Sequence, residues 1–286
     1  MILVADSGST KTAWKFIDDN RKVHSFHTLG FNPFFWTSKE IITEINKKCP
    51  KKLKSEISSH KSQICFYGAG CSSKQRTKIV KTALKKVFPK CKIEVEHDLL
   101  GAARAVCGNE KGIACILGTG SNSCFYDGKK IVRNIGGLGH ILGDEGSGKE
   151  IGKKLLNAYL NRFLPENIHK TFQRKYRLSK EKILNPVYRK QRPNQYLASF
   201  TKFAGQNIRE PFLHDLVKKC FLDFFDSHVC MYVEYKNVPV GFVGSVGFHF
   251  RHIVQEIANE KGIGLHKIIE NPMDELVEYH SGFHNN

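Results

Sequence analysis

Hydrophobic and polar positions along the chain change their spacing in an order that occurs twice. Residues 2–6, 13–18 and 22–28 are apolar or alternating segments between short polar turns, a pattern typical of antiparallel strands. The remainder of the first half predicts helix 38–47, strand 63–67, helix 72–87, strand 93–96 and helix 98–107. We therefore expect a three-stranded meander followed by alternating helices and strands.

The second half opens in the same way and then departs from it. Strands are predicted over 112–117, 123–127 and 130–134, followed by a long helical insertion from about Glu145 to Glu234. The pattern then returns to strand 238–243, a helix near 250–260 and strand 265–268, and the last periodic segment is 272–279. This duplication predicts two α/β domains with a cleft between them, one of residues 1–111 plus 271–286 and one of residues 112–270.

Glycine-containing turns follow the first strand of each predicted domain. Ile2–Thr12 ends its apolar run at Asp6 and turns at once through Gly8, and Ile113–Leu117 runs into Gly118–Asn122. Backbone N–H groups and hydroxyls gathered at a strand end suit phosphate oxygens and a hydrated magnesium ion. The two turns suggest two phosphate grips on one nucleotide, and simple hairpin turns are the alternative.

Composition is that of a globular protein without a membrane segment. A chain of 286 residues, of which 41% are hydrophobic, can bury a substantial core. No window reaches the roughly 18 consecutive apolar residues of a membrane helix. The first strand begins at residue 2, which leaves no room for a signal peptide. We expect a cytoplasmic protein with no membrane partner.

The net charge of +18 raises the question of nucleic acid binding. Positive residues cluster at 47–54, 74–92 and 170–192, and the second cluster alternates with apolar residues as one amphipathic helix does. No aromatic residues are interleaved as stacking platforms, and no recognition helix or RNA-binding signature occurs. A lysine-rich solvated surface is the favoured interpretation, and no nucleic acid partner is expected.

Nine cysteines are scattered along the chain with no C-x-x-C pair and no histidine cluster at zinc spacing. An odd number in a protein expected in the cytoplasm indicates thiols rather than disulfides. We expect neither a structural metal nor a disulfide.

Five segments in fixed order resemble one family: ADSGSTKT (5–12), VEHDLLGAARA (95–105), GTGSNS (118–123), GGLGHILGDEGS (136–147) and VGSVG (243–247). Together they resemble the N-acetylglucosamine kinase and BadF/BadG-type ATPase family of the sugar kinase, heat-shock 70 and actin superfamily. The resemblance implies two ribonuclease-H-like, actin-like ATPase domains. Each would hold a five-stranded mixed sheet flanked by helices, and the second would carry the helical insertion.

The resemblance also implies ATP and Mg²⁺ as cofactors and assigns residues to them. Asp6 matches the acid that holds magnesium through water. The remaining nucleotide contacts are implied for Ser7, Gly8, Ser9, Thr10, Lys11, Gly118, Thr119, Gly120, Gly244 and Ser245.

Sugar contacts are implied for Asn32, Asp98, Ser121, Asn122 and Asp144. Asp98 matches the general base that takes the proton of the attacking sugar hydroxyl, and its alternative is the N-cap of the helix that follows. Helix capping is also the alternative for Asp144, and a turn before proline is the alternative for Asn32. His140 stays open between a sugar contact and a structural role, and Leu138 leaves the shape of the acetamido pocket open.

The implied activity is transfer of the γ-phosphate of ATP to the 6-hydroxyl of N-acetylglucosamine or a relative such as N-acetylmuramate or glucosamine. The partner is then a small amino sugar, with a homodimer as one assembly state. The alternative is an ATPase that activates a partner enzyme around an iron–sulfur cluster, which is disfavoured because no cysteine lies in a comparable glycine-flanked loop. A non-catalytic sugar sensor is disfavoured because Asp6, Asp98 and both glycine turns are present.

Overall fold

The computed structural model describes residues 1–8, 10–59 and 62–282. The chain divides into two compact units, one formed by Met1–Asn109 with the segment from Asn271 onward, and one formed by Glu110–Glu270.

The first unit contains one mixed sheet in the order β3-β2-β1-β4-β5. Its strands are β1 (Ile2–Ser7), β2 (Lys11–Ile17), β3 (Val23–Leu29), β4 (Gln63–Gly68) and β5 (Lys92–His97). The first three strands are antiparallel, and β1, β4 and β5 are parallel. Asp18 closes the β2–β3 turn because its carboxylate accepts N–H bonds from Asn20 and Lys22, both at 2.9 Å.

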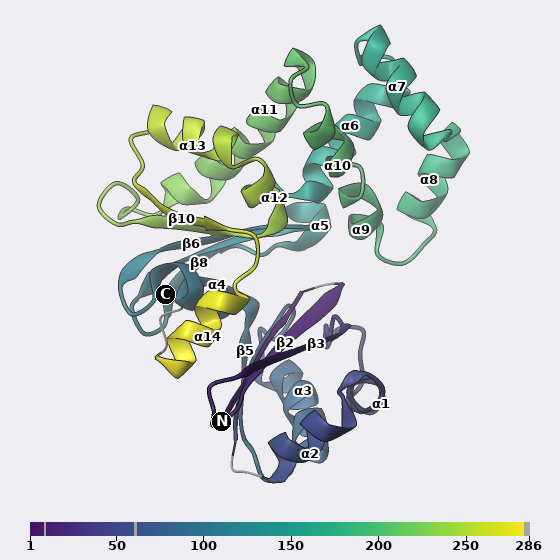
Figure 1. Ribbon diagram of the computed structural model, residues 1–286. Helices are drawn as coiled ribbons and strands as arrows, with labels where there is room; N and C mark the ends of the chain where they lie inside the picture. Colours follow the sequence, from purple (N-terminus) through teal and green to yellow (C-terminus); the bar gives the residue numbers. More distant parts are fainter. Residues whose placement is uncertain (9, 60–61, 283–286) are drawn as a thin grey trace. The chain divides into compact units, whose positions relative to one another are not determined.

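Helices cover both faces of this sheet (Figure 1). Helices α1 (Ser38–Lys48), α2 (Lys51–Ser59) and α3 (Lys74–Val87) share a core with Leu3, Ala5 and Trp14. Helices α4 (Asp98–Cys107) and α14 (Met273–Ser281) pack on the strands as well. Residues alternate between the two faces along a strand, so the neighbours of Leu3 and Ala5 on β1, among them Asp6, point away from α1–α3.

Helix α2 lies in a lysine-rich segment for which the sequence pattern predicted no helix. The segment has only two large apolar residues, Leu53 and Ile57, and both are buried in the core of the first unit. Two apolar residues four positions apart are enough to attach one helical face, although they are too few to stand out against a run of charge.

The second unit repeats the sheet of the first. Its strands are β6 (Lys111–Leu117), β7 (Ser121–Asp127), β8 (Ile131–Gly136), β9 (Val240–Val243) and β10 (Leu265–Ile269), in the order β10-β9-β6-β7-β8. Read from β8, this order and its strand directions match those read from β3 in the first unit. The predicted pair of five-stranded mixed sheets flanked by helices is confirmed.

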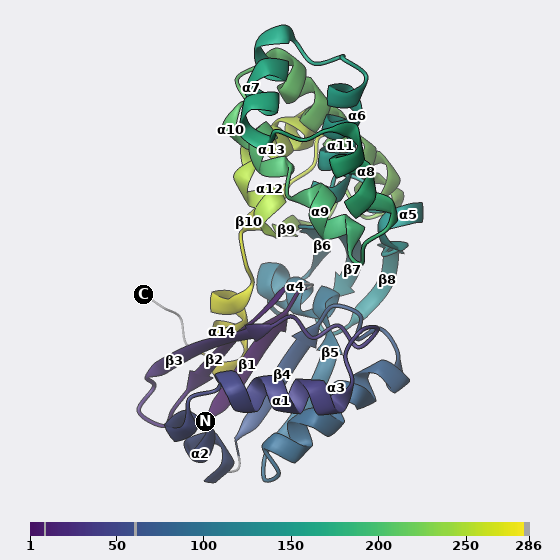
Figure 2. The ribbon, with the colours of Figure 1, turned by 90° about the vertical axis from the view of Figure 1, so that its right-hand side faces the viewer.

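The insertion between β8 and β9 is helical, as predicted, and Figure 2 shows α6 to α10 gathered in one group. Its elements are α5 (Gly139–Leu142), α6 (Gly148–Leu160), α7 (Glu166–Tyr176), α8 (Lys180–Tyr188), α9 (Pro193–Ala198), α10 (Thr201–Gln206), α11 (Pro211–Ser227) and the 3-10 helix η1 (Val229–Met231). The insertion has an aromatic core that includes Phe172, Phe200 and Phe203.

Helix α11 also joins the core of the sheet, together with α12 (Ser245–His249) and α13 (Arg251–Glu260). The helix predicted near 250–260 is thus preceded by a short separate helix. In the ranges that the structure describes, no helix is both long enough and apolar enough to cross a bilayer.

Candidate functional site

Two acids lie at the carboxyl edge of the first unit's sheet. Asp6 is the penultimate residue of β1 and faces Ala13 of β2 and Tyr67 of β4 in the register. Asp98 follows β5 directly and is the first residue of α4. Because β1, β4 and β5 are parallel, their carboxyl ends share one edge, and this brings together two residues that are far apart in sequence.

The electrostatics of Asp6 reflect this neighbourhood. Burial, followed by repulsion from the charge of Asp98, raises the pKa of Asp6 from 3.8 to about 7. The ionised form of a buried acid is destabilised further by a second acid nearby. A cation binds favourably at such a place, because it offsets both negative charges.

Asp98 is not the N-cap of α4, which corrects the alternative considered for it. The N-cap position is held by His97, whose backbone is extended and whose Nδ1 lies 3.1 Å from the backbone nitrogen of Leu99. The Asp98 residue already has helical geometry, so its carboxylate does not cap the helix and its Oδ1 lies 2.9 Å from His97 Nδ1.

Asp98 also alters the titration of His97. Burial lowers the pKa of His97, but the hydrogen bond and the attraction to Asp98 outweigh burial and raise it. One ring nitrogen cannot both accept from Leu99 and donate to Asp98. The raised pKa favours the protonated ring, which donates to the Asp98 carboxylate.

The first glycine turn joins β1 to β2. The Ser7 side chain is fully buried, and its hydroxyl lies 2.8 Å from the Thr12 hydroxyl and accepts the N–H of Phe31 at 2.9 Å. Gly8 donates its N–H to the carbonyl of Lys11 at 3.1 Å, and the side chains of Thr10 and Lys11 are exposed. Ser9, also predicted to bind nucleotide, lies outside the described residues. The Ser7 hydroxyl therefore fixes the base of the hairpin.

Asn32 lies against the turn that follows β4. A Cβ atom added at Gly70, where φ is +82°, would lie 2.4 Å from Asn32 Oδ1. This oxygen accepts the N–H of Phe34 at 3.0 Å, so the turn considered as an alternative role is present. Asn32 thus lies at the same edge of the sheet as Asp98.

In the second unit, the Gly118–Gly120 turn docks on the start of α6. Its carbonyls at Gly118 and Thr119 accept the N–H groups of Gly148 at 2.8 Å and Lys149 at 3.1 Å. Gly244 packs against the same turn with φ +126°, and a Cβ atom there would lie 2.3 Å from the carbonyl oxygen of Leu117. Four residues predicted to bind nucleotide are therefore neighbours, and Ser245 follows them as an exposed residue.

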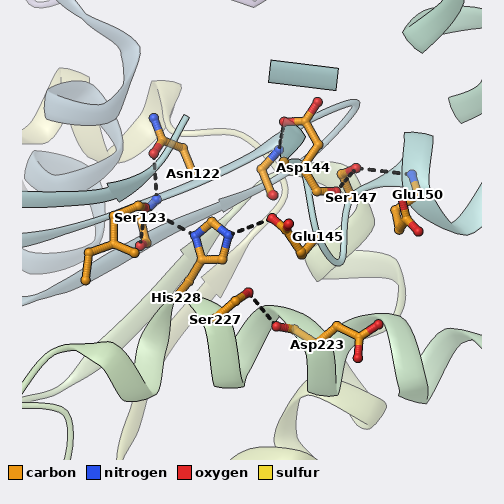
Figure 3. Close-up of polar contacts among 12 residues, drawn as sticks. Asn122, Ser123, Asp144, Glu145, Ser147, Glu150, Asp223, Ser227 and His228 are labelled. Carbon is orange, nitrogen blue, oxygen red and sulfur yellow. Dashed lines mark hydrogen bonds and ion pairs between the residues drawn. The ribbon is translucent and has the colours of Figure 1, made fainter. Parts of the chain in front are cut away.

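Asp144 is buried beside this turn in a left-handed conformation, with φ +68°. Its Oδ1 accepts the N–H of Ser121 at 3.0 Å, and its carbonyl accepts the Ser147 hydroxyl at 2.6 Å (Figure 3). A non-glycine residue held in this region costs roughly 1–3 kcal/mol and persists only where its surroundings fix it. Burial, the largest cause, raises the pKa of Asp144.

Ser147 caps α6 by accepting the N–H of Glu150, so neither Asp144 nor Glu145 is the N-cap considered as an alternative.

The other two residues of this unit that are predicted to contact the sugar, Ser121 and Asn122, differ in their hydrogen bonding. Ser121 Oγ is buried and, among the described residues, has no hydrogen-bond partner. The Asn122 side-chain oxygen accepts from Ser123 N at 2.9 Å and Asn134 Nδ2 at 2.7 Å. Ser121 is thus the hydroxyl that still requires a partner.

Three residues that support the site were not predicted: His97, Lys149 and His228. Lys149 is only 2% exposed and donates to the Gly143 carbonyl at 2.8 Å. His228, at the end of the insertion, contacts Glu145. Adjacency to Asp98 could have indicated His97, whereas no local motif marks Lys149 or His228.

The sequence matches the BadF/BadG/BcrA/BcrD ATPase family over residues 5–209. An N-acetylmuramic acid/N-acetylglucosamine kinase of Clostridium acetobutylicum is 28% identical over 68% of this chain and 67% of the relative. An N-acetyl-D-glucosamine kinase of Dictyostelium discoideum is 25% identical, over 54% of this chain and 52% of its own length.

Among solved structures, a protein of Porphyromonas gingivalis provisionally assigned as an N-acetylglucosamine kinase matches with 40% identity and a TM-score of 0.93, covering 99% of each chain. One of Chromobacterium violaceum, assigned in the same way, matches with 15% identity and a TM-score of 0.76 over 97% of this chain and 98% of its own, which supports the fold alone. From its sequence match and its fold, the chain belongs to the BadF/BadG/BcrA/BcrD ATPase family.

Proposed function

We propose that this chain is an ATP-dependent amino-sugar kinase. It transfers the γ-phosphate of ATP to the 6-hydroxyl of N-acetylglucosamine or a close relative, N-acetylmuramate or glucosamine. The observation that carries the proposal is the pair of acids at the carboxyl edge of the first sheet, Asp6 and Asp98, whose charges interact. The names of the Clostridium and Porphyromonas relatives support the same substrate class.

Nucleotide contacts fall in both units. In the first, Thr10 and Lys11 are exposed at the turn that Ser7 and Gly8 anchor, and an exposed lysine and hydroxyl suit phosphate oxygens. In the second, Gly118, Thr119 and Gly120 offer a turn free of bulky side chains, and Gly244 and Ser245 extend it toward the nucleoside. We assign these residues to ATP binding.

Magnesium fits the acid pair. Within the described residues, no three histidine, cysteine, aspartate or glutamate side chains are grouped as a metal cage, so the protein itself offers single carboxylates. Mg²⁺ is ordinarily held by one or two carboxylates, water and substrate phosphates. Asp6 would hold it through water, and the ion would neutralise charge on the phosphates.

Asp98 acts as the general base. It accepts the proton of the 6-hydroxyl while that oxygen bonds to the γ-phosphorus and the bond from this phosphorus to the β–γ bridging oxygen breaks, leaving ADP. The neighbouring His97 ring donates to Asp98 Oδ1 and so orients the carboxylate. Phosphoryl transfer needs mainly alignment of the reacting atoms and neutralisation of charge. The magnesium ion, Asp98 and His97 are groups of the kinds that these two tasks require.

Sugar recognition is assigned to Asn32, Asp98, Ser121, Asn122 and Asp144. The buried Ser121 hydroxyl that lacks a described partner supports this assignment, because a sugar hydroxyl can supply the missing hydrogen bond. Asp144 is held beside it by the N–H of Ser121. Buried groups of this kind reject substrates that leave them unpaired.

The activator ATPase finds less support. All nine cysteines lie in the described residues, and eight are buried while Cys230 is partly buried. Burial raises the pKa of Cys71 and Cys107 to about 12, which is typical of structural thiols in a core rather than of reactive ones.

A panel of amino sugars tests the proposal. ADP release is measured with ATP, Mg²⁺ and each of N-acetylglucosamine, N-acetylmuramate, glucosamine and, as controls, glucose and no sugar. If the chain is a sugar kinase, ADP release depends on the sugar and a phosphorylated sugar is among the products. ATP hydrolysis at the same rate with and without sugar would contradict it and favour the activator.

A further inference from the structure

His228 lies at the end of the helical insertion and contacts two parts of the segment that carries Asp144. The side chain is buried and stacks on Phe224, with ring centroids 4.5 Å apart. Its Nδ1 is 3.2 Å from the carbonyl oxygen of Ile135, and its Nε2 is 3.1 Å from Glu145 Oε2. Figure 3 shows the ring pointing toward Glu145.

The position of this ring depends on Gly136. A Cβ atom there would lie 2.2 Å from His228 Cε1, and the backbone has φ +99°. The ring therefore packs directly on the main chain at the end of β8, which a larger residue at 136 would prevent.

The atoms that face the two ring nitrogens of His228 decide how the ring is bound. A carbonyl oxygen only accepts, so Nδ1 must donate to Ile135. Burial raises the pKa of Glu145, but its hydrogen bond and attraction to His228 outweigh this and lower it, which favours a carboxylate as the partner of Nε2. Both ring nitrogens of His228 therefore face acceptor oxygens, and these two contacts tie the ring to Ile135 and to Glu145 at once.

Tyr232 also holds the backbone at Ile135, through a second set of hydrogen bonds. The N–H of Ile135 donates to the Tyr232 hydroxyl at 3.0 Å, and the Ser123 hydroxyl donates to the Ile135 carbonyl at 2.8 Å. The Tyr232 and Ser123 hydroxyls are 2.8 Å apart, so the proton between them belongs to Tyr232 and the three bonds close a ring. Both backbone polar groups of Ile135 are therefore bound by residues that follow α11.

These contacts fix both ends of one segment. Ile135 is held at the start, and Glu145 is held by His228 at the residue that follows Asp144. At the far end, the hydroxyl of Ser147 donates to the carbonyl of Asp144. A left-handed aspartate needs such constraints to persist.

We propose that His228 is a positioning residue that, through Glu145 and Ile135, holds residues 135–147 so that Asp144 is presented to the sugar. This inference rests on the proposed function, in which Asp144 contacts the sugar. It gives the end of the helical insertion a role, because α11 and the residues after it supply the groups that hold this segment.

Kinetics of the His228→Gln variant test the role. Misplacement of a positioned group by about 1 Å can reduce a rate by about 100-fold. We expect KM for the amino sugar to rise by about 10- to 100-fold while KM for ATP is unchanged, since the Gly118–Gly120 turn docks on α6 independently of His228. The double variant His228→Gln/Glu145→Gln should be no worse than His228→Gln alone, because the pair acts as a unit.

His214→Gln is the matched control. It makes the same chemical change within α11, the helix that His228 directly follows, at a partly exposed histidine whose nearest acid oxygens are those of Asp215 at 3.5 Å and Glu256 at 3.8 Å. Its kinetic constants should equal those of the wild type. A general loss of activity from weakening α11 would appear in this control as well, whereas a positioning role appears only at His228.

Amide hydrogen exchange in the sugar-free protein gives a readout independent of the reaction. The N–H groups of Ser121 and Ser147 donate to Asp144, so both should exchange faster in His228→Gln and not in His214→Gln. Wild-type exchange together with wild-type sugar KM in His228→Gln would overturn the inference. If His228→Gln does not fold, Glu145→Gln is judged by the same two measurements. If the wild type phosphorylates no amino sugar, the proposed function fails, and the exchange result still decides whether His228 holds the segment.

Discussion

At the scale of single residues, the candidate site contains acids whose ionisation is unfavourable in the folded protein. Burial raises the pKa of both Asp6 and Asp144, and each belongs to a group of polar residues at a strand end. Such acids reduce stability when ionised, and a bound cation or hydrogen-bond donor offsets this cost. Asp98 and His97 show where sequence reasoning stops: both can cap a helix, and only the backbone geometry shows that His97 does.

Replacement of Asp98 by asparagine should separate chemistry from binding. Asparagine keeps the shape but cannot take the proton, so kcat should fall by about 10²- to 10⁴-fold while ATP affinity stays close to that of the wild type. Steady-state kinetics and calorimetric titration with ATP measure the two quantities. Near wild-type turnover in Asp98→Asn would remove Asp98 from the mechanism.

Two alanine substitutions in one turn should have different effects. A Cβ at Gly120 would lie 2.7 Å from Asp144 Oδ1, whereas a Cβ at Gly118 meets no described atom within 4 Å. We expect Gly120→Ala to displace Asp144 and raise KM for the sugar. Gly118→Ala should raise KM for ATP by hindering the approach of phosphate to the backbone.

The two glycine variants control for each other, because both make the same change within three residues of one turn. Equal effects on both KM values would contradict the separate assignments. Kinetics with each substrate varied in turn provide the measurement.

At the scale of elements, helix α14 is attached to the first unit by a polar contact in its last turn. The Tyr67 hydroxyl lies 2.7 Å from His280 Nε2 and accepts from Arg104 Nη1 at 2.6 Å. When the imidazole is neutral with its bare Nε2 toward the hydroxyl, Tyr67 donates its proton to that nitrogen. Burial, then the charge of Arg104, lowers the pKa of His280 to about 4, while Glu94 acts in the opposite direction.

This contact predicts a loss of stability in acid. Between about pH 4 and 6.5, the unfolded chain binds a proton at His280 that the folded chain does not, so the free energy of unfolding falls as the pH falls through this window. Urea unfolding at a series of pH values should show this slope, and His280→Gln should reduce it. His214→Gln is the control, and an unchanged slope in His280→Gln would count against the assignment.

At the scale of the whole molecule, the proposed roles are distributed over two units with the same strand order. Asp6, Asp98 and Asn32 belong to one unit, whereas Gly118, Ser121 and Asp144 belong to the other. A kinase must also exclude water, because hydrolysis of ATP competes with transfer. We therefore predict that the two units close when ATP and the sugar bind.

Small-angle scattering tests closure directly. We expect the radius of gyration to fall when a non-hydrolysable ATP analogue and the amino sugar are bound together. The analogue alone and the sugar alone serve as controls. Identical dimensions in all states would contradict the prediction.

The sequence by itself determined the duplicated fold and most of the candidate residues. Strand periodicity, helix signals and glycine turns are local patterns, so they can be recognised without tertiary structure. Local patterns also led to Asp6 and Gly118–Asn122, because backbone N–H groups and hydroxyls at a strand end suit phosphate, whereas the roles of Asp98 and Asp144 came from the family resemblance. Helix α2 was not predicted, because its two core residues lie among lysines and leave no clear apolar periodicity.

Only the tertiary structure decided which side chains support these residues. His228 is 83 residues from Glu145 along the chain, and Ser7 is 24 residues from the Phe31 amide that binds its hydroxyl. Such pairs are created by packing, which depends on where complete elements meet and leaves no periodic trace in sequence. The structure likewise decided that the Ser7 hydroxyl is occupied, that the Ser121 hydroxyl has no partner among the described residues and that Asp144 is left-handed, because burial and hydrogen bonding are properties of the folded surroundings.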